Sequence, residues 1–264
     1  MNLREKYGEW GIILGATEGV GKAFAEKIAS EGMSVVLVGR REEKLQELGK
    51  SISETYGVDH MVIRADFAQS DCTDKIFEAT KDLDMGFMSY VACFHTFGKL
   101  QDTPWEKHEQ MINVNVMTFL KCFYHYMGIF AKQDRGAVIN VSSLTAISSS
   151  PYNAQYGAGK SYIKKLTEAV AAECESTNVD VEVITLGTTI TPSLLSNLPG
   201  GPAGEAVMKA AMTPEACVEE AFDNLGKSLS VIAAEHNKAN VHNWQANKTD
   251  DEYIRYMGSF YSNN

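Results

Sequence analysis

The chain contains no C-x-x-C pair, and cysteine accounts for only five of its 264 residues. The count is odd and the cysteines are widely scattered, as Cys72, Cys93, Cys122, Cys174 and Cys217. This pattern disfavours a disulfide-stapled scaffold and a structural zinc site. His236 and His242 lie six residues apart and do not share a helical face, so we expect no metal. Free thiols in a reducing cytoplasm fit the pattern best.

Basic residues and long apolar runs are also scarce. Lysine and arginine number 24 against 34 aspartates and glutamates, which gives a formal net charge of −10. Because nucleic-acid binding depends on basic patches, we expect no nucleic-acid partner. No stretch approaches about 18 uninterrupted apolar residues, so no membrane span is expected. The N-terminal MNLREKYGEW lacks the apolar core of a signal peptide.

Short β-branched runs do alternate with longer helical patterns. Strands are predicted at Gly11–Leu14, Val35–Val38, Met61–Arg64, Phe87–Ala92, Ala137–Val141, Val181–Leu186 and Leu229–Ala233. Helices are predicted at Gly19–Ser30, Glu42–Tyr56, Cys72–Thr80, Trp105–Lys132, Gln155–Ser176 and Thr213–Lys227, with a break inside the fourth. This alternation predicts a single-domain α/β fold over residues 1–264. It is Rossmann-type and doubly wound, a mostly parallel sheet of about seven strands with helices on both faces.

The first predicted strand runs directly into a glycine-rich turn that opens a helix. Such glycines allow a tight turn and close approach of the backbone to a pyrophosphate, while the helix N-terminus stabilises the anion. Glycines also punctuate ordinary strand–helix turns, so the signal depends on its position at the first junction. The candidate cofactor contacts here are Gly15, Thr17, Glu18, Gly19, Val20 and Gly21.

The end of the second strand bears on the choice between NAD and NADP. An NAD site places an acidic residue there for the ribose 2′-hydroxyl. This chain has Gly39, followed by Arg40 and Arg41, whose planar donor groups suit a 2′-phosphate. The alternative is that both arginines are solvated, although a helix N-terminus disfavours cations without a bound anion. We therefore expect NADP, with the side-chain direction of Glu18 left open.

Two residues follow the third strand in the stretch RADFAQ. Asp66, and with it Phe67, is a candidate contact of the adenine. A turn-forming role for Asp66 is equally compatible with the sequence.

The stretch QYGAGK places Tyr156 four residues before Lys160, so both lie on one helical face. A free phenol has a pKa of about 10, too high for easy proton exchange near neutrality. A nearby ammonium would lower that pKa and let Tyr156 act as general acid and base. Ser143, thirteen residues upstream at a strand end, is placed to hold a substrate oxygen. A Tyr-x-x-x-Lys pair alone also arises by chance in amphipathic helices.

Together, GATEGVG, SS…YGAGK and LGTTIT resemble the short-chain dehydrogenase/reductase family over essentially the whole chain. The resemblance implies that Tyr156 is the proton donor, that Ser143 orients the carbonyl, and that Lys160 supports tyrosine and cofactor. It implies that Asn115 holds a water in the proton relay. It also implies that Ile190 and Thr191 contact the nicotinamide carboxamide.

The sequence departs from this family after the fourth strand. The family's N-N-A-G is replaced by Tyr90, Val91, Ala92 and Cys93. We expect different packing behind the cofactor and no effect on the reactive groups.

Two further segments suggest a substrate site. The apolar stretch 192–212 is a candidate lid, although a surface helix pair would look the same. The C-terminal tail 244–264, with Tyr253, Tyr256, Phe260 and Tyr261, could border the pocket, contact a neighbouring subunit, or only complete the fold.

At closer range the chain is similar to the family of 7β-hydroxysteroid dehydrogenases of gut bacteria, including the YVAC stretch and LGTTITPSLLSNLPGGP. This resemblance implies NADP-dependent, reversible conversion of a bile acid such as ursodeoxycholate to its 7-keto form, and a homodimer or homotetramer. The alternatives are a β-ketoacyl thioester reductase and a non-catalytic NADP(H)-binding sensor. The acidic composition disfavours the first, and the intact set of Asn115, Ser143, Tyr156 and Lys160 disfavours the second.

Overall fold

The computed structural model describes residues 2–196, 198 and 200–259, so Phe260 and Tyr261 lie outside the described part. Seven parallel strands form one sheet in the order β3-β2-β1-β4-β5-β6-β7. The strands are β1 Trp10–Leu14, β2 Ser34–Gly39, β3 His60–Arg64, β4 Met85–Tyr90, β5 Gly136–Ser143, β6 Val179–Leu186 and β7 Ser230–Ile232. The predicted fold class is therefore confirmed, and all seven predicted strands are present.

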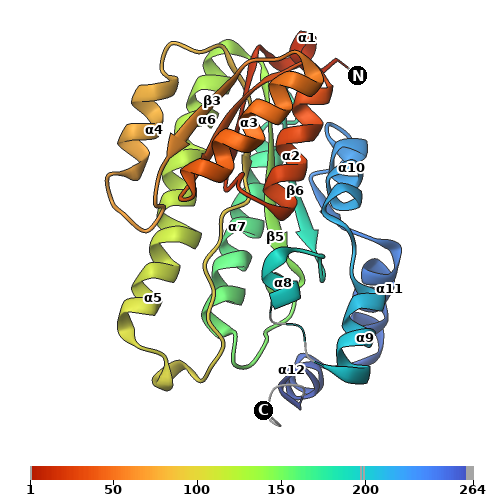
Figure 1. Ribbon diagram of the computed structural model, residues 1–264. Coiled ribbons are helices and arrows are strands. Elements are labelled where there is room, and N and C mark those ends of the chain that lie inside the picture. The colour runs from red at the N-terminus through yellow and green to blue at the C-terminus, as the bar shows by residue number, and fades with distance from the viewer. Residues whose placement is uncertain (1, 197, 199, 260–264) are drawn as a thin grey trace.

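Helices cover both faces of the sheet (Figure 1). They are α1 Leu3–Tyr7, α2 Gly19–Ser30, α3 Glu42–Tyr56, α4 Cys72–Thr80, α5 Trp105–Ile112, α6 Phe119–Gln133, α7 Ala154–Glu173, α8 Pro192–Ser196, α9 Gly201–Ala210, α10 Pro214–Asn224, α11 Glu235–Asn247 and α12 Asp250–Ser259. No described helix is long and apolar enough to cross a membrane.

Two hydrophobic cores hold these layers together, one on each face. The first packs α2, α3 and α10 on the sheet, with Phe24 and Val218 among its buried side chains. The second packs α4, α6 and α7 on the opposite face, with Phe119 and Ile163 fully buried. Strands buried on both faces explain why the sequence shows continuous apolar runs rather than alternation.

The predicted break in the fourth helix takes an unexpected form. Instead of two separate helices, α5 and α6 are joined by a π-helical segment, Asn113–Thr118. A π-helix accommodates an extra residue per turn and is frequent at functional sites. The chain direction therefore continues through the segment while the side-chain register shifts.

The tail forms helices that the sequence did not predict. The helices α11 and α12 follow β7 and lie at the end of the molecule where the described C-terminus is found (Figure 1). The α12 helix comes close to Pro151, because a Cβ added at Gly258 would lie 3.2 Å from Pro151 Cγ. This contact brings the tail beside the loop that precedes α7.

Candidate active site

A cleft of about 760 Å³ lies at the carboxyl ends of the strands. Its walls come from the turns after β1, β2, β3, β4, β5 and β6, and from α7, α8, α9 and α12. In this strand order the connections change direction between β1 and β4. Ligands of parallel α/β sheets bind at such a point.

The glycine-rich turn is shaped for close approach at one end of the cleft. Gly15 has a φ of +103°, and a Cβ there would lie 2.6 Å from the backbone nitrogen of Ala92. A Cβ at Gly21 would lie 2.0 Å from the carbonyl oxygen of Gly15. Larger residues are therefore excluded, and the open N-terminus of α2 faces the cleft. This geometry fits a dinucleotide pyrophosphate.

The end of β2 is cationic. Arg40 and Arg41 line the cleft, and Arg41 Nη2 lies 2.8 Å from Glu18 Oε2. Lys44, which the sequence reasoning missed, lies 3.6 Å from the same carboxylate oxygen. Glu18 thus turns its side chain toward the cations, which settles the direction left open above.

Gly39 leaves little room for the acidic residue of an NAD site. A Cβ at this position would lie 2.7 Å from Thr17 Oγ1. The two residues thus pack closely where a ribose would bind, and Thr17 also lines the cleft.

Asp66 and Phe67 line the next part of the cleft. Asp66 Oδ1 accepts a hydrogen bond of 3.1 Å from the backbone nitrogen of Ala68. Asp66 therefore does form the turn that was one of its two possible roles, while remaining open to a ligand. Phe67 is buried, and its carbonyl accepts from Thr118 Oγ1 over 2.8 Å.

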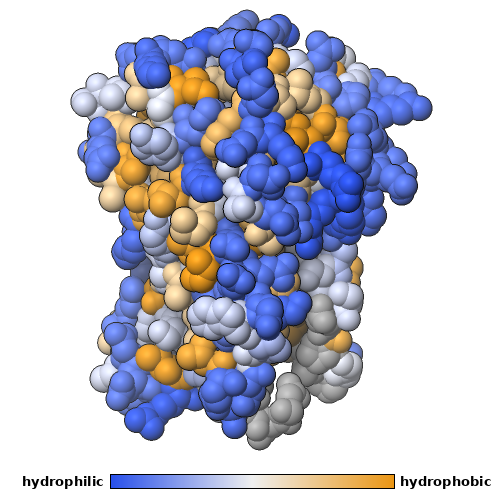
Figure 2. Space-filling view, turned by 90° about the vertical axis from the view of Figure 1, so that its left-hand side faces the viewer, coloured by the Kyte–Doolittle hydropathy of each residue, from blue (hydrophilic) through white to orange (hydrophobic). Residues whose placement is uncertain are grey.

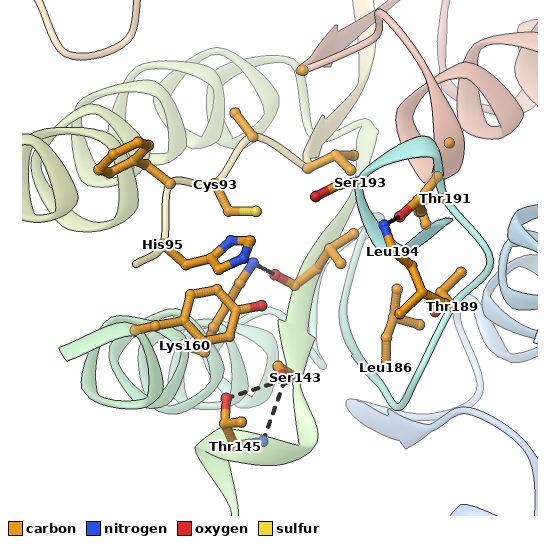
Figure 3. Close-up of a pocket in the computed structure, with 18 of the residues that line it drawn as sticks. Cys93, His95, Ser143, Thr145, Lys160, Leu186, Thr189, Thr191, Ser193 and Leu194 are labelled. Carbon is orange, nitrogen blue, oxygen red and sulfur yellow. Dashed lines mark hydrogen bonds between the residues drawn. The ribbon is translucent and has the colours of Figure 1, made fainter. Parts of the chain in front are cut away.

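Ser143, Tyr156 and Lys160 meet at the other end of the cleft, where Figure 3 labels Ser143 and Lys160. Ser143 ends β5, and its Oγ accepts hydrogen bonds from the backbone nitrogen and Oγ1 of Thr145, over 3.3 and 3.1 Å. Lys160 Nζ donates to the carbonyl of Val141 over 2.9 Å and lies 5.8 Å from the ring centroid of Tyr156. The sequence spacing therefore does bring these three side chains together.

The electrostatics of this corner differ from the expectation. Burial raises the pKa of Tyr156, the charge of Cys93 adds to the rise, and a hydrogen bond with Ser143 acts against it. Burial also lowers the pKa of Lys160. The predicted lowering of the tyrosine pKa by the lysine is therefore wrong: burial and Cys93 raise that pKa, and Lys160 is not among the groups that lower it.

Cys93 shows that the YVAC departure does reach the reactive groups, contrary to expectation. Its thiol lines the cleft, and Figure 3 shows it beside His95 and close to Lys160. Burial opposes ionisation, but a hydrogen bond with His95 and the charge of Lys160 outweigh it, so the Cys93 pKa is lowered. The signal was a cysteine at the position of the family's glycine. His95 also lies 5.5 Å from Tyr156, centroid to centroid.

Asn115 lies behind the cleft wall and holds the Phe94 backbone in place. It lies in the π-helical segment with an exposed fraction of 1% and is not part of the described cleft lining. Its Nδ2 donates to the carbonyl of Phe94 over 2.7 Å, and its Oδ1 accepts from the Phe94 nitrogen over 2.9 Å. Both backbone groups of Phe94 are thus fixed, which anchors the loop that carries Cys93 and His95.

The segment after β6 forms the remaining wall. Thr191 lines the cleft, and its Oγ1 accepts from the backbone nitrogen of Leu194 over 3.2 Å. Ile190, paired with Thr191 in the prediction, falls outside the described lining, and its nitrogen donates to the Met212 carbonyl over 2.8 Å. Among the described residues, Thr191 and not Ile190 therefore lines the cleft.

The described lining also contains residues that the sequence motifs did not identify. Apolar side chains from α8, α9 and α12 gather at the tyrosine end, and polar ones come from the loop before α7. They include Thr145, Ser148, Ser150, Asn153, Leu194, Val207 and Met257. Only the tertiary fold brings these segments together. Within the described residues, no cluster of three or more histidine, cysteine or acidic side chains could hold a metal.

Comparison with known proteins gives consistent matches. The family model described as short chain dehydrogenase matches residues 9–198. The chain is 75% identical over 261 residues to a 7beta-hydroxysteroid dehydrogenase of Mediterraneibacter gnavus, with 99% of both chains covered. It is 76% identical, over the same length and coverage, to the enzyme of that name from Collinsella aerofaciens. A solved structure from work on 7beta-hydroxysteroid dehydrogenase stereoselectivity matches with a TM-score of 0.95 and 75% identity, covering 97% of this chain and 99% of that one.

Proposed function

This chain belongs to the short chain dehydrogenase family of oxidoreductases, and from that premise we propose that it transfers a hydride reversibly between NADP(H) and the 7-position of bile acids. The reaction interconverts a 7β-hydroxyl group, as in ursodeoxycholate, and a 7-keto group. The whole-length identity to 7beta-hydroxysteroid dehydrogenases supports this substrate class. The observation that carries the proposal is one cleft with cations at one end and Ser143, Tyr156 and Lys160 at the other.

Tyr156 is proposed as the group that exchanges a proton with the substrate oxygen. Its raised pKa keeps the phenol protonated near neutrality, as a general acid for ketone reduction requires. In alcohol oxidation the phenol must first lose that proton, and the buried Lys160 then supplies the nearest ammonium. Both directions therefore use the same two side chains.

Ser143 is proposed to hold the substrate oxygen. Its Oγ already accepts hydrogen bonds from the nitrogen and Oγ1 of Thr145, so its single hydroxyl proton is left for Tyr156 or for a substrate oxygen that binds between them. A donor fixed in this way stabilises the negative charge that develops on a carbonyl oxygen during reduction.

Asn115 is proposed as a positioning residue. Its amide fixes Phe94 in the loop beside the cleft. The water-holding role implied by the family remains part of this proposal.

NADP is the proposed cofactor, and the nicotinamide supplies the carbon that gives or accepts the hydride. Gly15, Thr17, Gly19, Val20 and Gly21 fit the pyrophosphate turn, and Arg40 and Arg41 fit the 2′-phosphate. Glu18 would orient Arg41. Asp66 and Phe67 are the proposed adenine contacts. Thr191, rather than Ile190, is the proposed carboxamide contact, because Thr191 lines the cleft.

Residues 192–212 are proposed as a lid within the single domain 1–264. The ends of this excursion are tied together, because Thr189 and Met212 form a parallel bridge. Leu194 and Val207 line the cleft from inside the excursion, and Tyr253 does so from the tail 244–264. Slower amide hydrogen exchange in 192–212 with cofactor and steroid bound would support closure, whereas unchanged exchange would contradict it.

A homo-oligomer is proposed on a row of exposed apolar side chains along α5, the π-helical segment and α6. Trp105 and Tyr124 are 73% and 81% exposed, and Ile112 and Met117 lie between them. Figure 2 views the side of the molecule that carries α4 and α5, and it shows hydrophobic residues among hydrophilic ones there. Exposed apolar residues that lie together are commonly covered by a partner subunit. The five free cysteines support the proposed cytoplasmic location.

A spectrophotometric panel tests the proposed function. Purified protein is incubated with 7β-, 7α- and 3α-hydroxylated bile acids, each with NADP or NAD, and formation of the reduced cofactor is followed. We expect signal with 7β-hydroxyl substrates and NADP. Turnover of an acetoacetyl thioester without steroid turnover would favour the thioester reductase instead.

A further inference from the structure

Two buried polar atoms at the tyrosine end of the cleft have no role in the chemistry above. Ser150 and Asn153 line the cleft, and their exposed fractions are only 2% and 7%. Neither Ser150 Oγ nor Asn153 Oδ1 finds a hydrogen-bond partner within the described chain. Buried polar atoms are almost always paired, because leaving one unpaired costs free energy. Two of them, three residues apart in the wall of one cleft, indicate a polar group that the chain itself does not supply.

Asn153 occupies a position where its amide oxygen would ordinarily be used. It is the N-cap of α7, and asparagine is favoured there because its side-chain oxygen accepts from the first turn of the helix. In the described structure Asn153 makes no such bond. Only its backbone takes part in the first turn, where the Asn153 carbonyl accepts from the Gly157 nitrogen over 3.1 Å. The amide oxygen is therefore left unpaired within the described chain, at a residue that lines the cleft.

The turn between the two residues is held in an unfavourable backbone conformation. Tyr152 has a φ of +64°, in the left-handed region that non-glycine residues rarely adopt. Its carbonyl accepts a bond of 2.8 Å from the Gly98 nitrogen, and the Asn153 nitrogen donates to the Ser150 carbonyl over 3.2 Å. Strain fixed by surrounding contacts is found preferentially at ligand sites. The conformation keeps Ser150 and Asn153 in the cleft wall.

The cleft that this pair lines also has apolar walls. Leu194, Val207 and Met257 line the same cleft, and Phe97 does so from the loop after β4. Pro151, between Ser150 and Tyr152, lies against α12. A few fixed polar groups within an apolar wall orient a mostly hydrophobic ligand.

We propose that Ser150 and Asn153 form a subsite for a second hydroxyl group of the substrate, distinct from the oxygen at the reacting carbon. This rests on the proposed function, which makes the substrate a polycyclic alcohol. An amide oxygen only accepts, whereas a serine hydroxyl both donates and accepts. A substrate hydroxyl can satisfy both residues, while a keto oxygen at the same place can use only Ser150. The pair therefore selects steroids that carry a further ring hydroxyl.

The test compares two steroid acids that both carry a 7β-hydroxyl, one with a second ring hydroxyl and one without it. We expect Asn153→Ala to lower kcat/KM for the dihydroxy substrate by about ten-fold, because a buried hydrogen bond is lost. For the monohydroxy substrate we expect a change below about two-fold. Ser150→Ala should act in the same direction. The Tm of Asn153→Ala should stay level or rise, since an unpaired buried atom is removed, whereas loss of a helix cap would lower it.

Asn247→Ala is the matched control, because Asn247 is exposed on α11 and bonds Asn243. It should leave both rates unchanged. Equal losses with both substrates would overturn the subsite and assign Asn153 to the placement of Tyr156. Unchanged rates with both would overturn it as well, leaving a structural turn. Failure of the proposed function is recognised separately, because the wild-type protein would then oxidise neither steroid.

Discussion

Lys160 Nζ donates a hydrogen bond of 2.9 Å to the backbone carbonyl of Val141, in the strand that ends with Ser143. This bond joins α7 to β5, and the hydroxyl of Ser142 strengthens the joint by donating to the Lys160 carbonyl over 2.8 Å. The distance between the proposed oxygen holder and the proposed proton donor is thus set by two bonds across one helix–strand contact. A distance between two site residues is held more precisely by a helix and a strand than by loops.

Tyr156→Phe should abolish most turnover. Loss of the phenolic proton removes general acid–base catalysis, which contributes about 10²- to 10⁴-fold. We expect kcat to fall by that range while the Kd of NADP, measured by fluorescence titration, changes less than about two-fold. Tyr124→Phe, on the exposed face of α6, is the control. Near-normal steroid oxidation by Tyr156→Phe would refute the proposed role.

Arg40→Ala should distinguish the two cofactors. A charge-assisted hydrogen bond to the 2′-phosphate is worth about 1.5–3 kcal/mol, so NADP affinity should fall by about ten- to a hundred-fold. NAD affinity should hardly change, because NAD lacks that phosphate. Arg135→Ala is a suitable control, since Arg135 pairs with Asp84 and lies outside the described cleft lining. Equal losses for both cofactors would rule out NADP selection by Arg40.

Cys93 should react with thiol reagents before the other four cysteines. Its thiol is exposed to the cleft and its pKa is lowered, whereas burial raises the pKa of Cys72, Cys122, Cys174 and Cys217. Thiolates are the reactive form. Mass spectrometry after brief iodoacetamide treatment should show alkylation at Cys93 first, persisting below the pH at which ordinary thiols react.

Bound NADP should slow this alkylation, because Cys93 shares the cleft with the proposed cofactor site. The variant Cys93→Ser provides the blank for the assay. Faster labelling at half-buried Cys174 would contradict the prediction that Cys93 reacts first. No protection by NADP would contradict the position of Cys93 beside the proposed cofactor site.

Glu182 should make the protein less stable as the pH rises. It is fully buried in β6, neither carboxylate oxygen has a partner in the described structure, and its pKa is raised from 4.5 to about 8 by burial and by Glu220. Glu220 is held by Lys238 at 2.9 Å and by the Ala234 nitrogen at 2.7 Å. Above pH 4.5 the unfolded chain loses the Glu182 proton while the folded protein keeps it. Stability therefore declines between pH 4.5 and about 8, by up to about 1.4 kcal/mol per pH unit.

The variant Glu182→Gln should flatten this slope in urea unfolding at a series of pH values. Glu47→Gln, at an exposed position of α3, should leave it unchanged. A Glu182→Gln protein with the wild-type slope would show that Glu182 does not titrate in this range.

The apolar row on α5 and α6 should carry the subunit contact. Replacing Trp105 and Tyr124 together by glutamate places charge where a partner would exclude water, so sedimentation should shift toward monomer. Tyr56→Glu on α3 is the control, because Tyr56 is also an exposed aromatic residue. A wild-type protein that already sediments as a monomer would disprove the proposed oligomer.

Local sequence patterns were enough to predict the sheet and the grouping of Ser143, Tyr156 and Lys160. Continuous apolar strands, the turn at Gly15 and the four-residue spacing of Tyr156 and Lys160 all act over short stretches of chain. The structure adds what depends on distant segments. Glu18 meets Arg41 only after β2 pairs with β1, and Ser150 becomes buried only where α12 and the loop after β4 approach it.

Two expectations failed because each depends on what surrounds a side chain in the folded protein. The sequence shows that Lys160 can reach Tyr156, but not how completely the pair is withdrawn from water, and that decides the tyrosine pKa. The YVAC departure was expected to change only the packing behind the cofactor, because it replaces the family's asparagines, whereas Cys93 lines the cleft beside His95.

The widened helical turn around Asn115 makes the loop after β4 sensitive to a single deletion. Removing one residue between Asn113 and Thr118 would let a regular α-helical turn replace the widened one and would change the direction of the side chains within the segment. The Asn115 amide would then leave the Phe94 backbone. The loop that carries Cys93 and His95 would lose this anchor, although no residue proposed to contact the steroid had changed. The extra residue of the π-helical segment thus couples the exposed helices α5 and α6 to the loop beside the active site.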